Sequence, residues 1–180
     1  MASFSNLVRW GGLAAVLAGS IYAGQGFILP WFADPRVEAA FLVMLLLGVL
    51  AALAAIARLH ALQGGSYGRL GVVVSSVAFI GTAFLLVGAV LEALAGPAFE
   101  PAAIFLVIGL VVASGGLSFL GIVTLVAGVL PRWCGVLIIV GNPSVASFFT
   151  DYWWILNIAW VLVGYALFRA GTRRPSSPHV

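Results

Sequence analysis

Residues 37–57 read VEAAFLVMLLLGVLAALAAIA, an apolar run with a single charge, Glu38, that is bounded by Arg36 and Arg58. A helix of this length rises about 31 Å, which matches the hydrocarbon core of a bilayer. The rest of the chain has the same character, because 63% of its 180 residues are hydrophobic, 7% are charged and the mean hydropathy is +1.21. Soluble domains carry about 25% charged residues, so the sequence predicts an integral membrane protein.

Further apolar runs predict an all-α bundle of six transmembrane helices within residues 1–171, followed by a disordered cytoplasmic tail over residues 172–180. The predicted spans are residues 7–29, 37–57, 70–91, 102–127, 133–149 and 152–168. Two alternatives stay open. The first span could be a cleaved signal peptide, and the fifth, which Gly141-Asn142-Pro143 interrupts, could be a re-entrant loop.

The arginines predict the orientation of the bundle. If the N-terminus is cytoplasmic, seven arginines flank the cytoplasmic ends of the spans and only Arg36 lies outside, as the positive-inside rule requires. The absence of lysine and the abundance of alanine and glycine are typical of GC-rich bacterial genes. We therefore expect a multi-pass protein of a bacterial plasma membrane with both termini cytoplasmic. The basic residues form no patch, which argues against nucleic acid as a partner.

Three spans that leave the cytoplasm begin alike, at Arg9-Trp10-Gly11, Arg69-Leu70-Gly71 and Arg132-Trp133-Cys134-Gly135. This likeness favours three helical hairpins in tandem. The alternative is that each residue type is expected separately at such a boundary.

The first span also carries a stripe of small residues at every fourth position, Gly11, Ala15, Gly19 and Ala23. Such a stripe lets another helix approach closely. One interpretation is packing within the chain, and the other is a seam with a second copy of the chain or with another membrane protein.

Uncharged polar residues and one carboxylate gather in the outer half of the predicted bundle. Pro143 lacks an N–H and frees a backbone carbonyl, and irregular backbone at membrane depth must face protein or water. The pattern predicts either a small polar pocket that opens outward or hydrogen bonds between helices. The residues concerned are Gln25, Asn142, Ser144, Ser147, Asp151 and Asn157.

Several chemistries are excluded by residue type. Without lysine no Schiff base can form, and the single cysteine, Cys134, allows no intrachain disulfide. We assign His60 to a solvated cytoplasmic loop over residues 58–69 and His179 to the tail, which leaves no histidine inside a span for haem, zinc or a catalytic triad. We therefore expect no enzyme activity, cofactor or metal.

The chain resembles the uncharacterised small six-helix membrane proteins of GC-rich bacteria over about residues 7–170. The resemblance lies in Tyr67-Gly68-Arg69-Leu70-Gly71, Leu130-Pro131-Arg132-Trp133, Ile155-Leu156-Asn157-Ile158-Ala159-Trp160 and Gly164-Tyr165-Ala166-Leu167. It implies location and helix count, and no activity. The functional expectation is a structural or accessory protein that acts in the bilayer through helix–helix association. The alternative is a binder or transporter of a small molecule or lipid.

Overall fold

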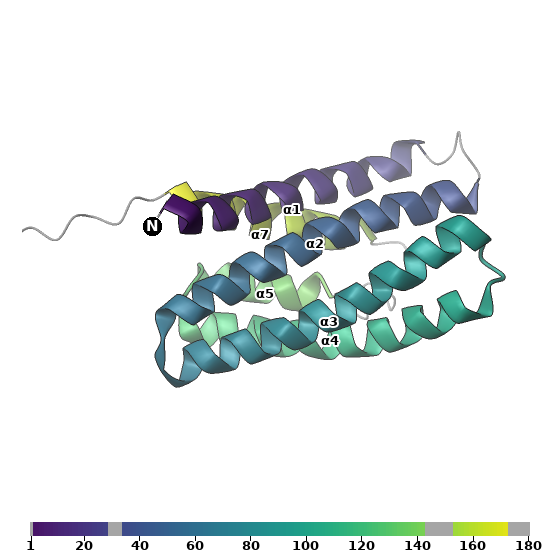
Figure 1. Cartoon of the computed structure of the whole chain (residues 1–180). Helices are drawn as coiled ribbons and strands as arrows, with labels where there is room; N and C mark the ends of the chain where they lie inside the picture. The colour runs from purple at the N-terminus through teal and green to yellow at the C-terminus, as the bar shows by residue number, and fades with distance from the viewer. Residues whose placement is uncertain (1, 29–33, 143–152, 173–180) are drawn as a thin grey trace, which may run out of the picture.

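The computed structural model describes residues 2–28, 34–142 and 153–172, and its regular secondary structure in these ranges is helical (Figure 1). Its six helices are α1 (Ala2–Ile28), α2 (Pro35–Gln63), α3 (Gly65–Ala95), α4 (Glu100–Ala127), α5 (Arg132–Val140) and α7 (Trp153–Thr172). The all-α prediction is confirmed. Helices α2, α3 and α4, with 29, 31 and 28 residues, are long and apolar enough to cross a membrane, which supports a membrane protein.

Three such helices among the described residues are fewer than the six spans that the sequence predicted. Helix α5 shows one physical reason. The fifth span was expected over residues 133–149, but α5 ends at Val140 after nine residues, or about 13 Å, and Gly141 and Asn142 close a turn onto Leu137 O and Ile139 O. Pro143, the next residue in the sequence, has no N–H with which to extend the helical ladder.

The prediction of a loop over residues 58–69 is wrong, because nearly all of these residues are helical. Helix α2 runs on to Gln63 and α3 begins at Gly65, so Gly64 alone separates them. Gly64 and Gly65 have φ angles of 67° and 64°, a left-handed backbone that glycine adopts without steric cost. Helix α2 therefore continues beyond Arg58, and α3 begins before Arg69, the two arginines that bound the predicted spans.

The contacts between the described helices form a closed ring. Successive helices lie side by side and α7 returns to α1, while α2 also touches α7. Neighbours occur within and between the proposed hairpins, so this packing does not single out a hairpin repeat. The centre of the ring is filled by large apolar side chains, each at most 2% exposed, from four helices: Leu53, Ile56, Leu117, Leu120, Ile138 and Leu167.

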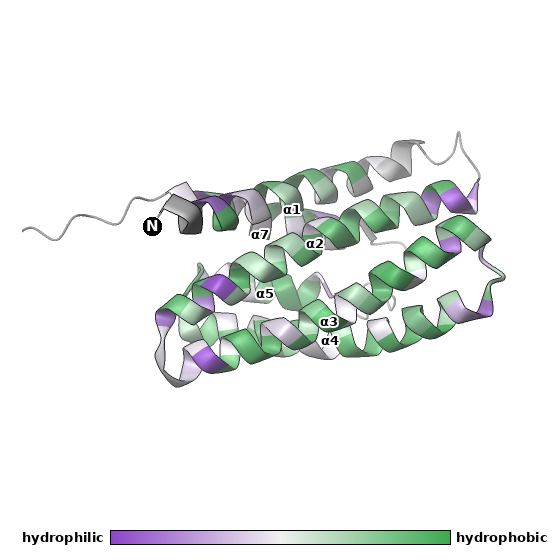
Figure 2. Ribbon diagram, viewed as in Figure 1, coloured by the Kyte–Doolittle hydropathy of each residue, from purple (hydrophilic) through white to green (hydrophobic). Residues whose placement is uncertain are grey.

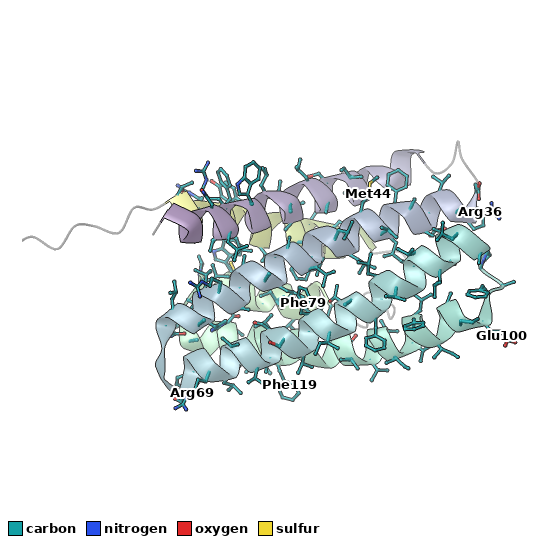
Figure 3. All side chains as sticks on the ribbon, in the orientation of Figure 1. Arg36, Met44, Arg69, Phe79, Glu100 and Phe119 are labelled. Carbon is teal, nitrogen blue, oxygen red and sulfur yellow. The ribbon has the colours of Figure 1, made fainter. Side chains whose placement is uncertain are left out.

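The surface of the bundle is apolar in its middle and polar at its two ends (Figure 2). Figure 3 shows Arg36 and Glu100 at one end and Arg69 at the other, with Phe119 on the outer surface of the apolar belt, 62% exposed. The two arginines that bound the apolar part of α2, Arg36 and Arg58, are about 33 Å apart along the helix. This thickness suits a bilayer of about 30 Å.

Candidate functional site

The small-residue stripe of α1 lies at contacts inside the chain. A Cβ atom added at Gly11 would lie 2.6 Å from Ala51 O of α2, and one at Gly19 would lie 2.9 Å from Val161 Cγ2 of α7. Ala15 is 1% exposed and lies against Gly164 of α7, while Ala23 is half-buried. Three of the four residues thus lie between α1 and its two neighbours in the ring, α2 and α7.

Asn142 joins two helices. Its side chain is 1% exposed, and Nδ2 donates to Ser114 O at 2.7 Å and to Ser118 Oγ at 2.9 Å, both on α4. Asn142 therefore links the end of α5 to the middle of α4 through its amide protons. Hydrogen bonds of this kind between helices are one of the two interpretations of the polar cluster.

Only one other member of the predicted polar cluster has a described side chain. Asn157 is 2% exposed on α7, and its backbone oxygen faces Gly19 of α1. The side chain of Gln25 and the residues Ser144, Ser147 and Asp151 lie outside the described part of the chain. The predicted tail from residue 173 onward lies outside it as well.

The carbonyl at the end of α5 also has a partner. Trp160 of α7 is 3% exposed and its Nε1 donates to Gly141 O at 3.3 Å. A tryptophan inside an apolar helix needs an acceptor for its N–H, and here the interruption of α5 supplies one. Because Asn142 holds this turn to α4 while Trp160 holds it to α7, the end of α5 is fixed from both sides.

His60 is the residue that the sequence analysis misplaced. Instead of lying in a solvated loop it is helical, in α2, and 0% exposed. Its ring packs on Gly71 of α3, where a Cβ atom would collide with the imidazole. A signal was available: Leu53, Ile56 and His60 recur at the spacing of one helical face, and the first two are core residues.

Three of the described helices, α2, α3 and α4, carry buried polar atoms without hydrogen-bond partners in the half of the bundle that contains His60. In the described residues they include both of its ring nitrogens, Thr124 Oγ1 on α4 and Ser75 Oγ on α3. Thr124 is 0% exposed and Ser75 is 1% exposed. Gln63 lies one turn beyond His60, close enough to interact with the ring, but no hydrogen bond of normal geometry joins the two side chains.

Buried polar groups without hydrogen bonds lower the stability of the folded protein. A buried polar group without a hydrogen bond costs about 1–3 kcal/mol in proteins, and more where no water can reach it. Most of the polar side chains in natural protein interiors have partners. We take as the candidate site the partnerless polar atoms that α2, α3 and α4 carry in the half of the bundle that holds Arg58 and Arg69.

The described residues contain no group of three or more His, Cys, Asp or Glu side chains that could hold a metal ion. Cys134 is a free, fully buried thiol at the start of α5. The chemistry available at the site is thus that of neutral hydrogen-bonding groups, an imidazole and two hydroxyls.

No protein-family model, curated protein or solved structure matches the chain.

Proposed function

We propose that this chain is a multi-pass protein of a bacterial plasma membrane with both termini in the cytoplasm, and that it binds or carries a small polar solute in its interior. The topology is supported by the arginines. Arg9, Arg58, Arg69, Arg132 and Arg169 lie at one end of the bundle, while Arg36 lies at the other with four of the carboxylates, a bias that sets orientation in bacterial membranes.

The topology is tested with single cysteines in a Cys134→Ala background. Ser66 near the start of α3 and Ala98 in the turn that follows α3 are both exposed, at opposite ends of the bundle. An impermeant maleimide should label Ala98→Cys in intact cells, whereas Ser66→Cys should react only after the membrane is opened. A protease-sensitive tag at each terminus should stay protected in the same cells. Labelling of Ser66→Cys from outside, or loss of either tag, would contradict the proposed map.

The observation that carries the function is the burial of His60 without a hydrogen-bond partner for either ring nitrogen. A buried polar group without a partner is costly, and each such group in a native structure calls for an explanation, such as a functional role or a bound water or ion. Thr124 and Ser75 add two hydroxyls in the same state. The unpartnered groups of the site are an imidazole and two hydroxyls, which offer neutral hydrogen bonds. These favour an uncharged hydrogen-bonding solute over an ion.

The proposal is tested in liposomes that contain the purified protein. Stopped-flow light scattering reports how fast the vesicles recover volume after a step in urea or glycerol. The wild-type protein should speed recovery for at least one of these solutes, and His60→Leu should remove the gain. His179→Gln, which changes the other histidine, serves as the matched control and should behave as wild type. Recovery no faster than that of empty liposomes for either solute would refute a carrier of such solutes.

Association with a second copy of the chain is the other candidate function. The stripe on α1 supports it little, because its contacts lie within the chain, but Gly115 of α4 is exposed and has nothing within 4 Å of its Cβ position. It lies between Val111 and Phe119, which are 68% and 62% exposed. A glycine on a lipid-facing surface lets the backbone of another helix approach. Native mass spectrometry showing only monomers would refute this candidate, whereas dimers that Gly115→Leu abolishes would support it.

A further inference from the structure

Helices α2 and α4 run in the same direction, because each is antiparallel to α3, which lies between them in sequence (Figure 1). One hydrogen bond ties their arginine-rich ends together: Gln63 Nε2 of α2 donates to Ala127 O of α4 at 2.6 Å. This bond fixes the register of the two helices where α2 and α4 approach across α3.

His60 lies three residues before Gln63 on α2, and Thr124 lies three residues before Ala127 on α4. Residues three apart lie on the same side of a helix, so both side chains sit one turn further into the bundle than the bond between Gln63 and Ala127. Both are 0% exposed. The shared register therefore places the imidazole and the Thr124 hydroxyl at the same level in the interior.

Helix α3 contributes the third group. Its Gly71 lies under the imidazole, and Ser75, one turn further along α3, lies on the same side of that helix and is 1% exposed. The neutral imidazole needs one donor and one acceptor as partners, and each hydroxyl can both donate and accept. No protein atom lies within hydrogen-bonding distance of these groups in suitable geometry.

We propose that ordered water occupies this level of the bundle and bridges His60 to Thr124, with Ser75 as a further contact. The inference deepens the proposed function and rests on the same site, for which it names the resident ligand. When buried polar groups fail to reach one another directly, a water molecule is the usual link. Buried waters typically make about three hydrogen bonds to groups that would otherwise have none, and these three side chains offer that number.

The sign of a stability change tests the proposal. Thr124→Val removes the hydroxyl and keeps the shape of the side chain. If water bridges the two residues, this variant should melt at a lower temperature than wild type in detergent. In a His60→Phe background, where the bridge is already lost, the same change should be neutral or should raise the melting temperature. A dry interior predicts the opposite: Thr124→Val would remove a partnerless hydroxyl and raise the melting temperature by the same amount in both backgrounds, which would overturn the proposal.

Thr82 provides the matched control. It is 1% exposed on α3, but its Oγ1 already donates to Ala78 O at 2.8 Å. Thr82→Val makes the same chemical change at a buried threonine that has its own partner. Its effect should be equal in the wild-type and His60→Phe backgrounds. If it depends on His60 as strongly as Thr124→Val does, the coupling is a general response of the fold and the proposal fails.

Water-edited solid-state NMR provides a direct readout. With ¹⁵N-labelled histidine and His179→Gln, the only imidazole signal comes from His60. In bilayers this signal should receive polarisation from water, and Thr124→Val should weaken the transfer at least twofold. No transfer in the wild-type protein would refute the bridge. This readout does not involve solute flux, so the two proposals can fail separately. If His60 receives polarisation from water but the protein speeds the passage of neither urea nor glycerol, the carrier function is refuted and the water site remains.

Discussion

Gly115 and Gly116 are consecutive on α4 and lie in opposite surroundings, which makes them a sharp test of the helix packing. A Cβ atom added at Gly116 would lie 2.5 Å from the backbone nitrogen of Ala78 on α3 and 2.6 Å from its Cα. A Cβ atom at Gly115 would meet nothing within 4 Å. We predict that alanine destabilises the protein at the first position and not at the second.

The magnitude follows from these distances. An ordinary Cβ contact begins at 3.4 Å, so α3 and α4 must separate by up to about 1 Å to admit a methyl group at Gly116. A gap of this size forfeits roughly a quarter to a half of the dispersion energy of the atoms it parts, and overpacking costs about 1–3 kcal/mol. Alanine in place of an exposed helical glycine contributes about 0.5–1 kcal/mol of stability. The two variants should therefore differ by about 1.5–4 kcal/mol.

The assay is unfolding by sodium dodecyl sulfate in mixed micelles, followed by circular dichroism and tryptophan fluorescence. Gly116→Ala and Gly115→Ala have identical compositions, so differences in detergent binding largely cancel. The midpoint for Gly116→Ala should fall well below that of wild type, while that for Gly115→Ala should equal or exceed it. Equal midpoints, or the reverse order, would show that α3 and α4 do not approach each other as closely at Ala78 as the structure has them.

Further predictions concern the end of α5, the α2–α3 turn and the single thiol. Asn142→Leu removes two hydrogen bonds to α4 and should lower stability by about 1–3 kcal/mol, whereas an unchanged unfolding midpoint would contradict the observed contacts. Trp160→Phe removes the bond to Gly141 O and should cost about 0.5–1.5 kcal/mol in the same assay; a more stable variant would mean that this bond is not made. Gly65→Ala places a side chain at a φ of 64° and should destabilise the protein by about 1–2 kcal/mol, and a midpoint equal to that of wild type would indicate another turn conformation. Cys134 is 0% exposed, so a maleimide should modify it after denaturation and only slowly before; rapid labelling of the folded protein would contradict its burial.

Composition and pattern predicted the class of fold and most of the helices. Hydrocarbon offers no hydrogen bonds, so apolar runs of this length are driven to be helical whatever their neighbours are. For this reason the starts of α2, α4 and α7 and the end of α4 fall within two residues of the predicted spans. The same pattern predicted the end of α2 and the start of α3 wrongly, at Arg58 and Arg69. A charged residue indicates where an apolar run ends, but a helix ends only where its backbone turns, here at Gly64 and Gly65.

The candidate site was harder to foresee, and the error at His60 shows why. A loop was predicted beyond Arg58, and His60 was therefore expected to be exposed to solvent. Whether a polar side chain near the end of a span meets water or the core depends on which face it occupies and on what covers that face. Here Gly71 of α3 leaves room for the ring, a feature that only the approach of two helices reveals. Likewise, the polar residues around Asn142 could be listed from the sequence, but the partners Ser114 and Ser118 could not.

The sequence by itself determined that the chain is helical, that its exterior is apolar and that its arginines collect at one end, because each of these depends on the solvent and on residue type alone. Only the tertiary structure decided which glycines admit a neighbouring helix, where α5 stops and which polar atoms remain without partners. Those outcomes depend on the relative register of helices that are distant in the chain. A shift of one residue along a helix turns each side chain by about 100°, and no composition or periodicity fixes that rotation for two helices at once.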